Sequence, residues 1–226
     1  GTVCDVVPLI GLNRAIVKQG LKVLKSKKNL GIKTLFDICK IEASPSVYHL
    51  GYLLGPRINA GGRVGKCSHG ANLLLNKDPK YSFKLASELD QYNKERQILE
   101  KDLLNKILSV SKDYLKDPVL ILTGKNWHEG VIGIVAARLK DKYNKPVILI
   151  SSDGNIGKAS ARSIVGFDIG SVIIGATQKK ILIKGGGHKM AGGFSIQVEN
   201  IEIFKDYAFK KFKGINEDLK SVKPLL

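Results

Sequence analysis

The feature that most constrains the fold is an unbroken helical pattern from Tyr81 to about Leu115. Apolar side chains recur at helical spacing along one stripe, and charged residues fill most of the other positions. The stripe consists of Leu85, Leu89, Tyr92, Leu99, Leu103, Ile107, Val110 and Tyr114. Asp117 and Pro118 end the pattern, because proline cannot continue a helix. A helix of about 33 residues is on the order of 50 Å long, so we expect it to connect two lobes.

The segment after this helix, residues 116–213, alternates between apolar runs and amphipathic helical patterns. The alternation predicts an α/β domain of about 100 residues. Residues 214–226 show no periodic pattern, and we interpret them as a linker. Predicted strands cover residues 118–124, 145–154, 157–164 and 192–198, and predicted helices cover 131–143, 168–180 and 200–213.

The segment before the long helix is predicted to be mainly helical. Helical patterns cover residues 13–25, 33–40 and 46–54, after a short apolar run at residues 3–10. We interpret Gly31 as a break between the first two helices. The stretch GPRINAGGRVGK contains four glycines and a proline. We expect it to be a loop, because glycine and proline destabilise a helix interior.

The charge, apolar runs and cysteines of the chain limit the classes of function that it can have. The formal net charge of +17 and the pI of about 9.7 favour a polyanionic partner such as a nucleic acid. Most of the 37 basic residues are lysines, so solvated surface charge is the alternative. No apolar run reaches the length of about 18 residues that a membrane-spanning helix needs, and the three separated cysteines suggest neither a disulfide framework nor a zinc site. We expect a cytoplasmic protein without a membrane role.

Two candidate sites precede the long helix. Asp5 lies within the apolar run, where a buried carboxylate needs a partner, so it is a candidate metal ligand. Capping of a turn or pairing with Arg14 is the alternative. Arg57, Asn59 and Arg63 lie in GPRINAGGR, where guanidinium groups and accessible backbone N–H groups suit a phosphate. A purely structural turn is the alternative here.

Two further candidates follow the long helix. His128 directly precedes a predicted helix, so it could contact an anion at the helix N-terminus or simply cap the helix. Ser160 and Arg162 lie two positions apart on a predicted strand and therefore share one face. A hydroxyl beside a guanidinium suits a clamp for a terminal phosphate. An exposed polar face without a ligand is the other interpretation.

The sequence KGGGHKMAGGF, residues 184–194, packs five glycines around His188. Gly185, Gly186 and Gly187 can adopt positive φ and expose successive N–H groups. The later pair of glycines would let the next strand pass close by. We therefore expect an oxyanion-binding nest with one imidazole at its rim.

In this order, the segments GTVCDVVPL, GPRINAGGR, NWHEGVIGIVAARL, SARS and GGGHKMAGGFSI resemble motifs of the RecJ-type exonucleases, a family of the DHH phosphoesterase superfamily. ELDQYNKERQ is similar to the start of the family's interdomain helix, and the resemblance covers residues 1–213. It implies the C-terminal part of a DHH lobe at residues 1–80, a connecting helix at 81–115 and a mixed-sheet α/β DHH-associated domain at 116–213. The linker at 214–226 would lead to an OB-fold.

The resemblance also implies a function. The family hydrolyses single-stranded DNA from 5′ to 3′ in DNA repair and recombination, by two-metal catalysis with manganese or magnesium. The site residues it implies are Asp5 as a metal ligand; Arg57, Asn59 and Arg63 at the scissile region; Ser160 and Arg162 at the terminal 5′ phosphate; and His188, with Gly185, Gly186 and Gly187, at a substrate phosphate.

Two departures qualify this resemblance. The other metal ligands of the family, including the DHH triad, would lie before Gly1, and the chain begins with neither a methionine nor a signal-peptide pattern. Gly61 and Gly192 stand where alanine is usual. We therefore expect a piece of a larger nuclease, inactive alone, for which an upstream polypeptide carrying the rest of the DHH domain is a candidate partner.

Two other functions compete with this interpretation. One is a DHH-family oligoribonuclease or 3′,5′-bisphosphate nucleotide phosphatase. The other is a non-catalytic nucleic-acid-binding module that keeps the phosphate contacts without the metals. The long helix and the segment NWHEGVIGIVAARL favour the RecJ type.

Overall fold

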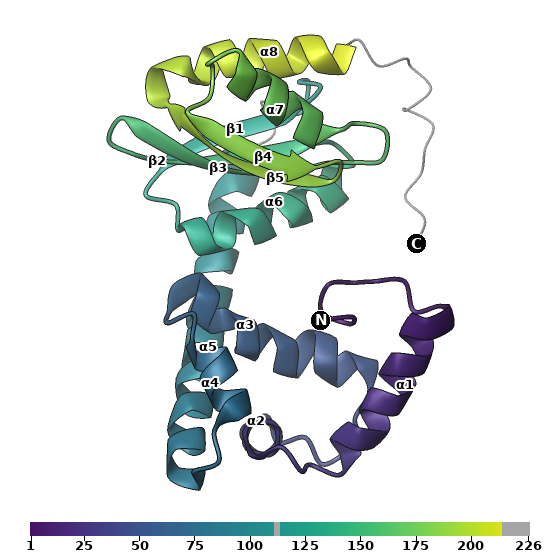
Figure 1. Ribbon diagram of the computed structural model, residues 1–226. Coiled ribbons are helices and arrows are strands. Elements are labelled where there is room, and N and C mark those ends of the chain that lie inside the picture. Colours follow the sequence, from purple (N-terminus) through teal and green to yellow (C-terminus); the bar gives the residue numbers. More distant parts are fainter. Residues whose placement is uncertain (111–113, 214–226) are drawn as a thin grey trace. The chain divides into compact units, whose positions relative to one another are not determined.

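The computed structural model describes residues 1–110 and 114–213 (Figure 1). These residues fall into two compact units, with the division between Ile98 and Leu99. The N-terminal unit is built from helices, and the C-terminal unit combines a β-sheet with helices. The predicted α/β fold class is confirmed.

The predicted long helix is α5, Pro79–Val110. Its stripe serves two cores, because Leu85 is buried in the N-terminal unit and Ile107 in the C-terminal unit. The stripe packs into these cores between Leu85 and Ile107, whereas Val110, which we also predicted to belong to it, is 49% exposed. The end of the helix differs from the prediction: Tyr114 is not in an α-helix. Residues 111–113 lie outside the described part of the chain.

Short helical segments precede α5 and pack their apolar sides together. They are α1 (Gly11–Lys25), α2 (Leu30–Ile38), a π-helical turn (His49–Leu54), α3 (Gly55–Val64) and α4 (His69–Leu75). Gly31 lies inside α2 rather than between two helices, so that prediction is wrong. A Cβ on Gly31 would lie 2.1 Å from the carbonyl oxygen of Leu73. Glycine is therefore needed where α2 packs closely against α4.

The stretch that we predicted to be a loop is helix α3. Pro56 stands in the first turn, where its missing N–H would have no helical partner anyway. A Cβ on Gly55 would lie 2.3 Å from the sulfur of Cys4, and a Cβ on Gly61 would lie 2.5 Å from the carbonyl oxygen of Lys66. The prediction was wrong because the unfavourable helix propensity of glycine is offset here by close packing that only glycine allows.

The C-terminal unit contains a five-stranded mixed sheet with the order β1-β2-β3-β5-β4. Strands β1 and β2 are parallel, and the other neighbours are antiparallel. The strands are β1 (Leu120–Lys125), β2 (Val147–Asp153), β3 (Ile156–Arg162), β4 (Lys184–His188) and β5 (Ala191–Gln197). The predicted strands at β1, β2, β3 and β5 are confirmed, whereas β4 was not predicted.

Helices cover both faces of this sheet, but unequally. Helices α7 (Ile169–Gln178) and α8 (Ile201–Lys213), the latter following a 3-10 turn (Val198–Asn200), lie on one face. Their core includes Phe194 of β5 and Phe204 of α8. Helix α6 (Glu129–Tyr143) lies on the other face and packs on β2 and β3 (Figure 1). On this second face the side chains of β5 and β4 remain accessible to solvent.

Two further observations concern membrane-spanning helices and the state of the cysteines. Across the described residues, no helix is both long enough and apolar enough to cross a membrane. All three cysteines carry free thiols.

Candidate functional site

The face of the sheet beside α6 carries a regular array of small and donor-bearing residues. Residues directly opposite on neighbouring strands point to the same face, so the pairing of β3, β5 and β4 defines three rows. The rows are Lys158, Ser195 and Lys184; then Ser160, Gly193 and Gly186; then Arg162, Ala191 and His188.

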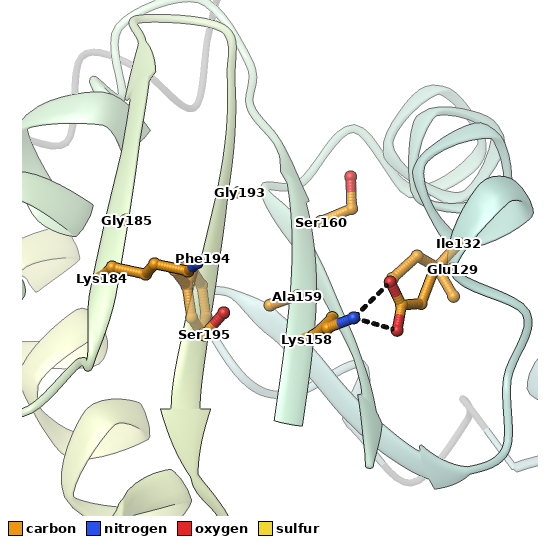
Figure 2. Close-up of a pocket in the computed structure, with 10 residues that line it drawn as sticks. All are labelled: Glu129, Ile132, Lys158, Ala159, Ser160, Lys184, Gly185, Gly193, Phe194 and Ser195. Atoms are coloured by element: carbon orange, nitrogen blue, oxygen red, sulfur yellow. Dashed lines mark hydrogen bonds and ion pairs between the residues drawn. The ribbon is translucent and has the colours of Figure 1, made fainter. Parts of the chain in front are cut away.

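This array forms a trough. The middle strand, β5, contributes only serine, glycine and alanine, so the floor is low. The flanking strands contribute lysine, arginine, serine and histidine side chains. A pocket of about 600 Å³ lies over the first two rows, and Glu129 and Ile132 of α6 complete its wall (Figure 2). A trough rich in hydrogen-bond donors and positive charge, with an unobstructed floor, suits a polyanionic strand.

Ser160 and Arg162 lie on one face of β3, the arrangement that strand alternation predicts. The Nη1 atom of Arg162 donates to the Oγ of Ser160 at 3.2 Å and to the carbonyl oxygen of Ala161 at 2.8 Å. Gly133 of α6 faces both side chains: a Cβ there would lie 2.8 Å from the Ser160 Oγ and 3.0 Å from the Arg162 Nη2. Because Gly133 has no side chain, this turn of α6 leaves room for the Ser160 hydroxyl and the Arg162 guanidinium.

The glycines before His188 form strand β4 and not the expected nest. None of Gly185, Gly186 and Gly187 has a positive φ, and their backbones pair with β5. A Cβ on Gly185 would lie 2.7 Å from the Cγ2 of Ile173, and a Cβ on Gly187 would lie 2.4 Å from a backbone oxygen of β5. Gly185 and Gly187 are required by the close approach of α7 and β5, which the sequence alone does not reveal.

Gly186 differs from its neighbours in the strand. A Cβ on Gly186 would meet nothing within 4 Å, and a Cβ on Gly193, its partner on β5, would meet only the Ala159 carbonyl oxygen, at 3.3 Å. Packing therefore does not explain the glycine at position 186. The two glycines keep the floor of the trough clear beside Ser160.

His188 ends β4 with its imidazole fixed in one tautomer. Its Nδ1 accepts hydrogen bonds from the backbone N–H groups of Met190 at 3.1 Å and Ala191 at 3.2 Å. A ring nitrogen that accepts cannot carry the proton, so in the neutral ring the proton is on Nε2. The exposed His188 side chain thus offers a donor at the end of the trough.

His128 adopts the capping role that we considered as the alternative. It is the N-cap residue of α6, and its Nδ1 accepts a hydrogen bond from the N–H of Gly130 at 3.1 Å. Trp127 beside it packs against the core between α6 and the sheet. His128 is exposed, and its Nε2 carries the proton in the neutral ring. The adjacent Glu129, not His128, lines the pocket.

In the N-terminal unit, α3 separates the three residues that we grouped as one phosphate site. Arg57 faces α5, where its Nε donates to the Oδ1 of Asp90 at 2.8 Å and its Nη1 donates to the Leu53 carbonyl oxygen at 2.8 Å. Asn59 and Arg63 are exposed and four positions apart, so they share another side of the helix. Arg57 is therefore held in a structural ion pair.

The carboxyl of Asp90 has a lowered pKa. Burial opposes its ionisation, but hydrogen bonds from Lys94 and Arg57, together with their positive charges, outweigh that effect. Asp90 is therefore ionised at neutral pH and joins α3 to α5.

Asp5 lies in an exposed turn, not in a buried run as we expected. The neighbouring Val6 is 85% exposed and has a φ of 54°. Among residues 1–110 and 114–213, no group of three or more histidine, cysteine, aspartate or glutamate side chains could hold a metal ion. The premise of a buried carboxylate was wrong, and the role of Asp5 as a metal ligand stays a prediction.

Sequence reasoning missed four residues of the trough: Lys158, Lys184, Ser195 and Glu129. Lysines and serines are common surface residues, so their types gave no signal. Only the pairing of strands distant in sequence shows that Lys158 and Lys184 share a row with Ser195. The strand predicted at 157–164 already placed Lys158 on the same face as Ser160, which was the one usable signal.

Comparisons with known proteins agree with this architecture. Residues 116–214 match the DHHA1 domain family. The chain is 36% identical over 217 residues to the single-stranded-DNA-specific exonuclease RecJ of Dickeya dadantii, covering 91% of this chain and 37% of that protein. It is also 36% identical over 216 residues to the RecJ of Haemophilus influenzae, with the same coverage of both chains.

Comparison with solved structures also shows similarity to RecJ. The chain resembles the crystal structure of Thermus thermophilus RecJ in complex with Mn²⁺, with a TM-score of 0.84 and 30% identity, covering 95% of this chain and 32% of that one. The chain thus spans about a third of the length of these relatives. Similar sequence along nine-tenths of the chain, a similar fold and a DHHA1 match at residues 116–214 show that this chain is similar to about a third of a RecJ exonuclease.

Proposed function

We propose that this chain is the substrate-binding part of a RecJ-type exonuclease that degrades single-stranded DNA from the 5′ end in DNA repair and recombination. The observation that carries the proposal is the trough on β3, β5 and β4, where donors flank a floor without large side chains. The net charge of +17 supports a polyanionic substrate. Relatives named as single-stranded-DNA-specific exonucleases support the choice of DNA.

We propose a phosphate contact for each group of residues along the trough. Ser160 and Arg162 hold the terminal 5′ phosphate, because a hydroxyl and a guanidinium converge there. His188, through Nε2, and the strand Gly185–Gly187 contact the backbone that follows. His128 is a weaker candidate, since its cap leaves Nε2 as its only donor.

The N-terminal unit would act at the scissile bond. We assign residues 1–80 to the DHH lobe, residues 81–110 of α5 to the connecting helix and 116–213 to the DHH-associated domain; the linker predicted at 214–226 lies outside the described residues. Asn59 and Arg63 on the exposed side of α3 would contact the strand, with Arg57 positioning that helix through Asp90. The proposed compartment is the cytoplasm, where free thiols stay reduced.

The metal requirement points to a second polypeptide segment. Related RecJ structures were solved with Mn²⁺ and with Mg²⁺, and such ions supply an activated water and stabilise the leaving oxygen. Asp5 offers one carboxylate for them, so no step of hydrolysis is assigned to the described residues. We propose that an upstream polypeptide with the rest of the DHH domain completes the site.

Two measurements test this proposal. Fluorescence anisotropy should show tighter binding of a 5′-phosphorylated single-stranded oligonucleotide than of its 5′-hydroxyl counterpart, and Arg162→Ala should remove the difference. Manganese-dependent digestion should appear only when the chain is mixed with the upstream segment. Binding without digestion in the mixture would favour a non-catalytic nucleic-acid-binding module. Equal binding of both oligonucleotides by the unmodified chain would contradict the 5′-end assignment.

A further inference from the structure

We propose that Lys158, Ser195 and Lys184 form a second anion subsite that holds the phosphodiester next to the terminal phosphate, and that Glu129 competes with DNA for Lys158. This inference rests on the proposed function, because it assumes a 5′ phosphate at Ser160. It adds a second binding site in the row next to Ser160, and at this site Glu129 competes with the DNA for Lys158.

The register places the three residues in one row. Lys158 on β3 is opposite Ser195 on β5, and Ser195 is opposite Lys184 on β4. Figure 2 shows the Lys184 side chain extending from β4 to β5, where it ends beside Phe194 and Ser195. Rows on one face of a strand are about 6.6–6.8 Å apart, two residues of roughly 3.3–3.4 Å each. This row is therefore a separate position, adjacent to the one occupied by Ser160.

The chemistry of the row suits a phosphodiester. It offers two ammonium groups and one hydroxyl, all donors toward an anion. Among the residues that the structure describes, Lys184 forms no ion pair with a carboxylate. Gly186 and Gly193, which lie in the row of Ser160, leave the floor open beside this row. A strand can therefore continue from one position to the next without meeting a side chain.

Lys158 is held by a carboxylate from α6. Its Nζ lies 2.8 Å from the Oε1 and 3.0 Å from the Oε2 of Glu129 (Figure 2). The two side chains are 58% and 56% exposed, and exposed ion pairs of this kind contribute little net stability. A phosphodiester can therefore replace Glu129 as the partner of Lys158. Because Glu129 lies at the pocket wall, its charge also opposes the approach of an anion.

The test measures binding of 5′-phosphorylated single-stranded DNA by fluorescence anisotropy. Lys184→Gln should weaken binding roughly three- to tenfold and reduce the slope of log K against log salt by about 0.7. Glu129→Gln should tighten binding severalfold, and this gain should be smaller in the Lys158→Gln background, where only the repulsion between Glu129 and the anion is removed. Lys210→Gln, on α8 across the sheet, is the matched control for a lost positive charge.

A strand with a neutral methylphosphonate at its first internal linkage locates the contact. On that strand Lys184→Gln should bind like the unmodified chain. An equal loss on both strands, or no loss on either, would refute the second subsite. If the unmodified chain prefers 5′-phosphorylated DNA while the lysine variants bind normally, only this inference fails. If the unmodified chain shows no such preference, the proposed function fails with it.

Discussion

We predict that Gly133→Ala weakens binding of a 5′-phosphorylated strand while leaving the stability of the fold nearly unchanged. An alanine in a helix interior is favoured over glycine by about 1 kcal/mol. The new Cβ would lie 2.8 Å from the Ser160 Oγ and 3.0 Å from the Arg162 Nη2, so both side chains must move. Displacing a side chain from its rotamer costs about 0.5–1.5 kcal/mol. The two effects nearly offset each other, and the free energy of unfolding should change by about 0.5 kcal/mol or less.

Binding should respond more strongly than stability. A hydrogen bond to a charged group contributes about 1.5–3 kcal/mol, so loss of the Ser160 contact should weaken binding of the phosphorylated strand by roughly 10- to 150-fold. The assay measures the dissociation constant of the 5′-hydroxyl strand divided by that of the 5′-phosphorylated strand, and this ratio should fall toward one. Gly20→Ala in α1 is the control, because its Cβ would meet nothing within 4 Å. An unchanged ratio in folded Gly133→Ala protein would refute the assignment of Ser160 and Arg162 to the terminal phosphate.

Three further predictions concern stability and are checked by denaturant or thermal unfolding. Asp90→Asn should destabilise the N-terminal unit by about 1–3 kcal/mol, because Arg57 loses its ionised partner. Since the folded pKa of Asp90 lies below its ordinary 3.8, this contribution is present above about pH 4 and is lost as the pH falls through the folded pKa; a variant with an unchanged acid response would contradict this. Gly187→Ala should destabilise the C-terminal unit because its Cβ would approach backbone atoms of β5, whereas Gly186→Ala should fold normally; equal effects of the two substitutions on stability would contradict this. His128→Ala should lower the free energy of unfolding by about 1 kcal/mol through loss of the α6 cap. An unchanged free energy of unfolding would contradict a stabilising role of the cap and would leave the Nε2 donor as the function of His128.

The helices and strands were predictable where local signals were strong. Helix α5 carries an apolar stripe over many turns, and strands β1 and β2 are apolar runs of ordinary length. The helix and the strand that we failed to predict, α3 and β4, are both rich in glycine. In α3 and in β4, glycine is present because another segment approaches closely. That requirement is invisible in a local pattern, where glycine normally indicates a loop.

The candidate site was only partly predictable for the same reason. Strand alternation placed Ser160 and Arg162 on one face, because that rule needs only neighbouring residues. The opposite error occurred at Asp5, where an apolar run suggested burial and the structure shows an exposed turn. Neighbouring side chains alone do not determine whether a segment is covered.

The sequence by itself determined the element types, the long helix shared by two units, the basic character and the family motifs. These follow from local periodicity, charge and residue identity. Only the tertiary structure decided that β5 lies between β3 and β4, and thereby that Lys158, Ser195 and Lys184 form one row. Register between strands distant in the chain depends on packing of the whole sheet against α6, α7 and α8, and no local pattern specifies it.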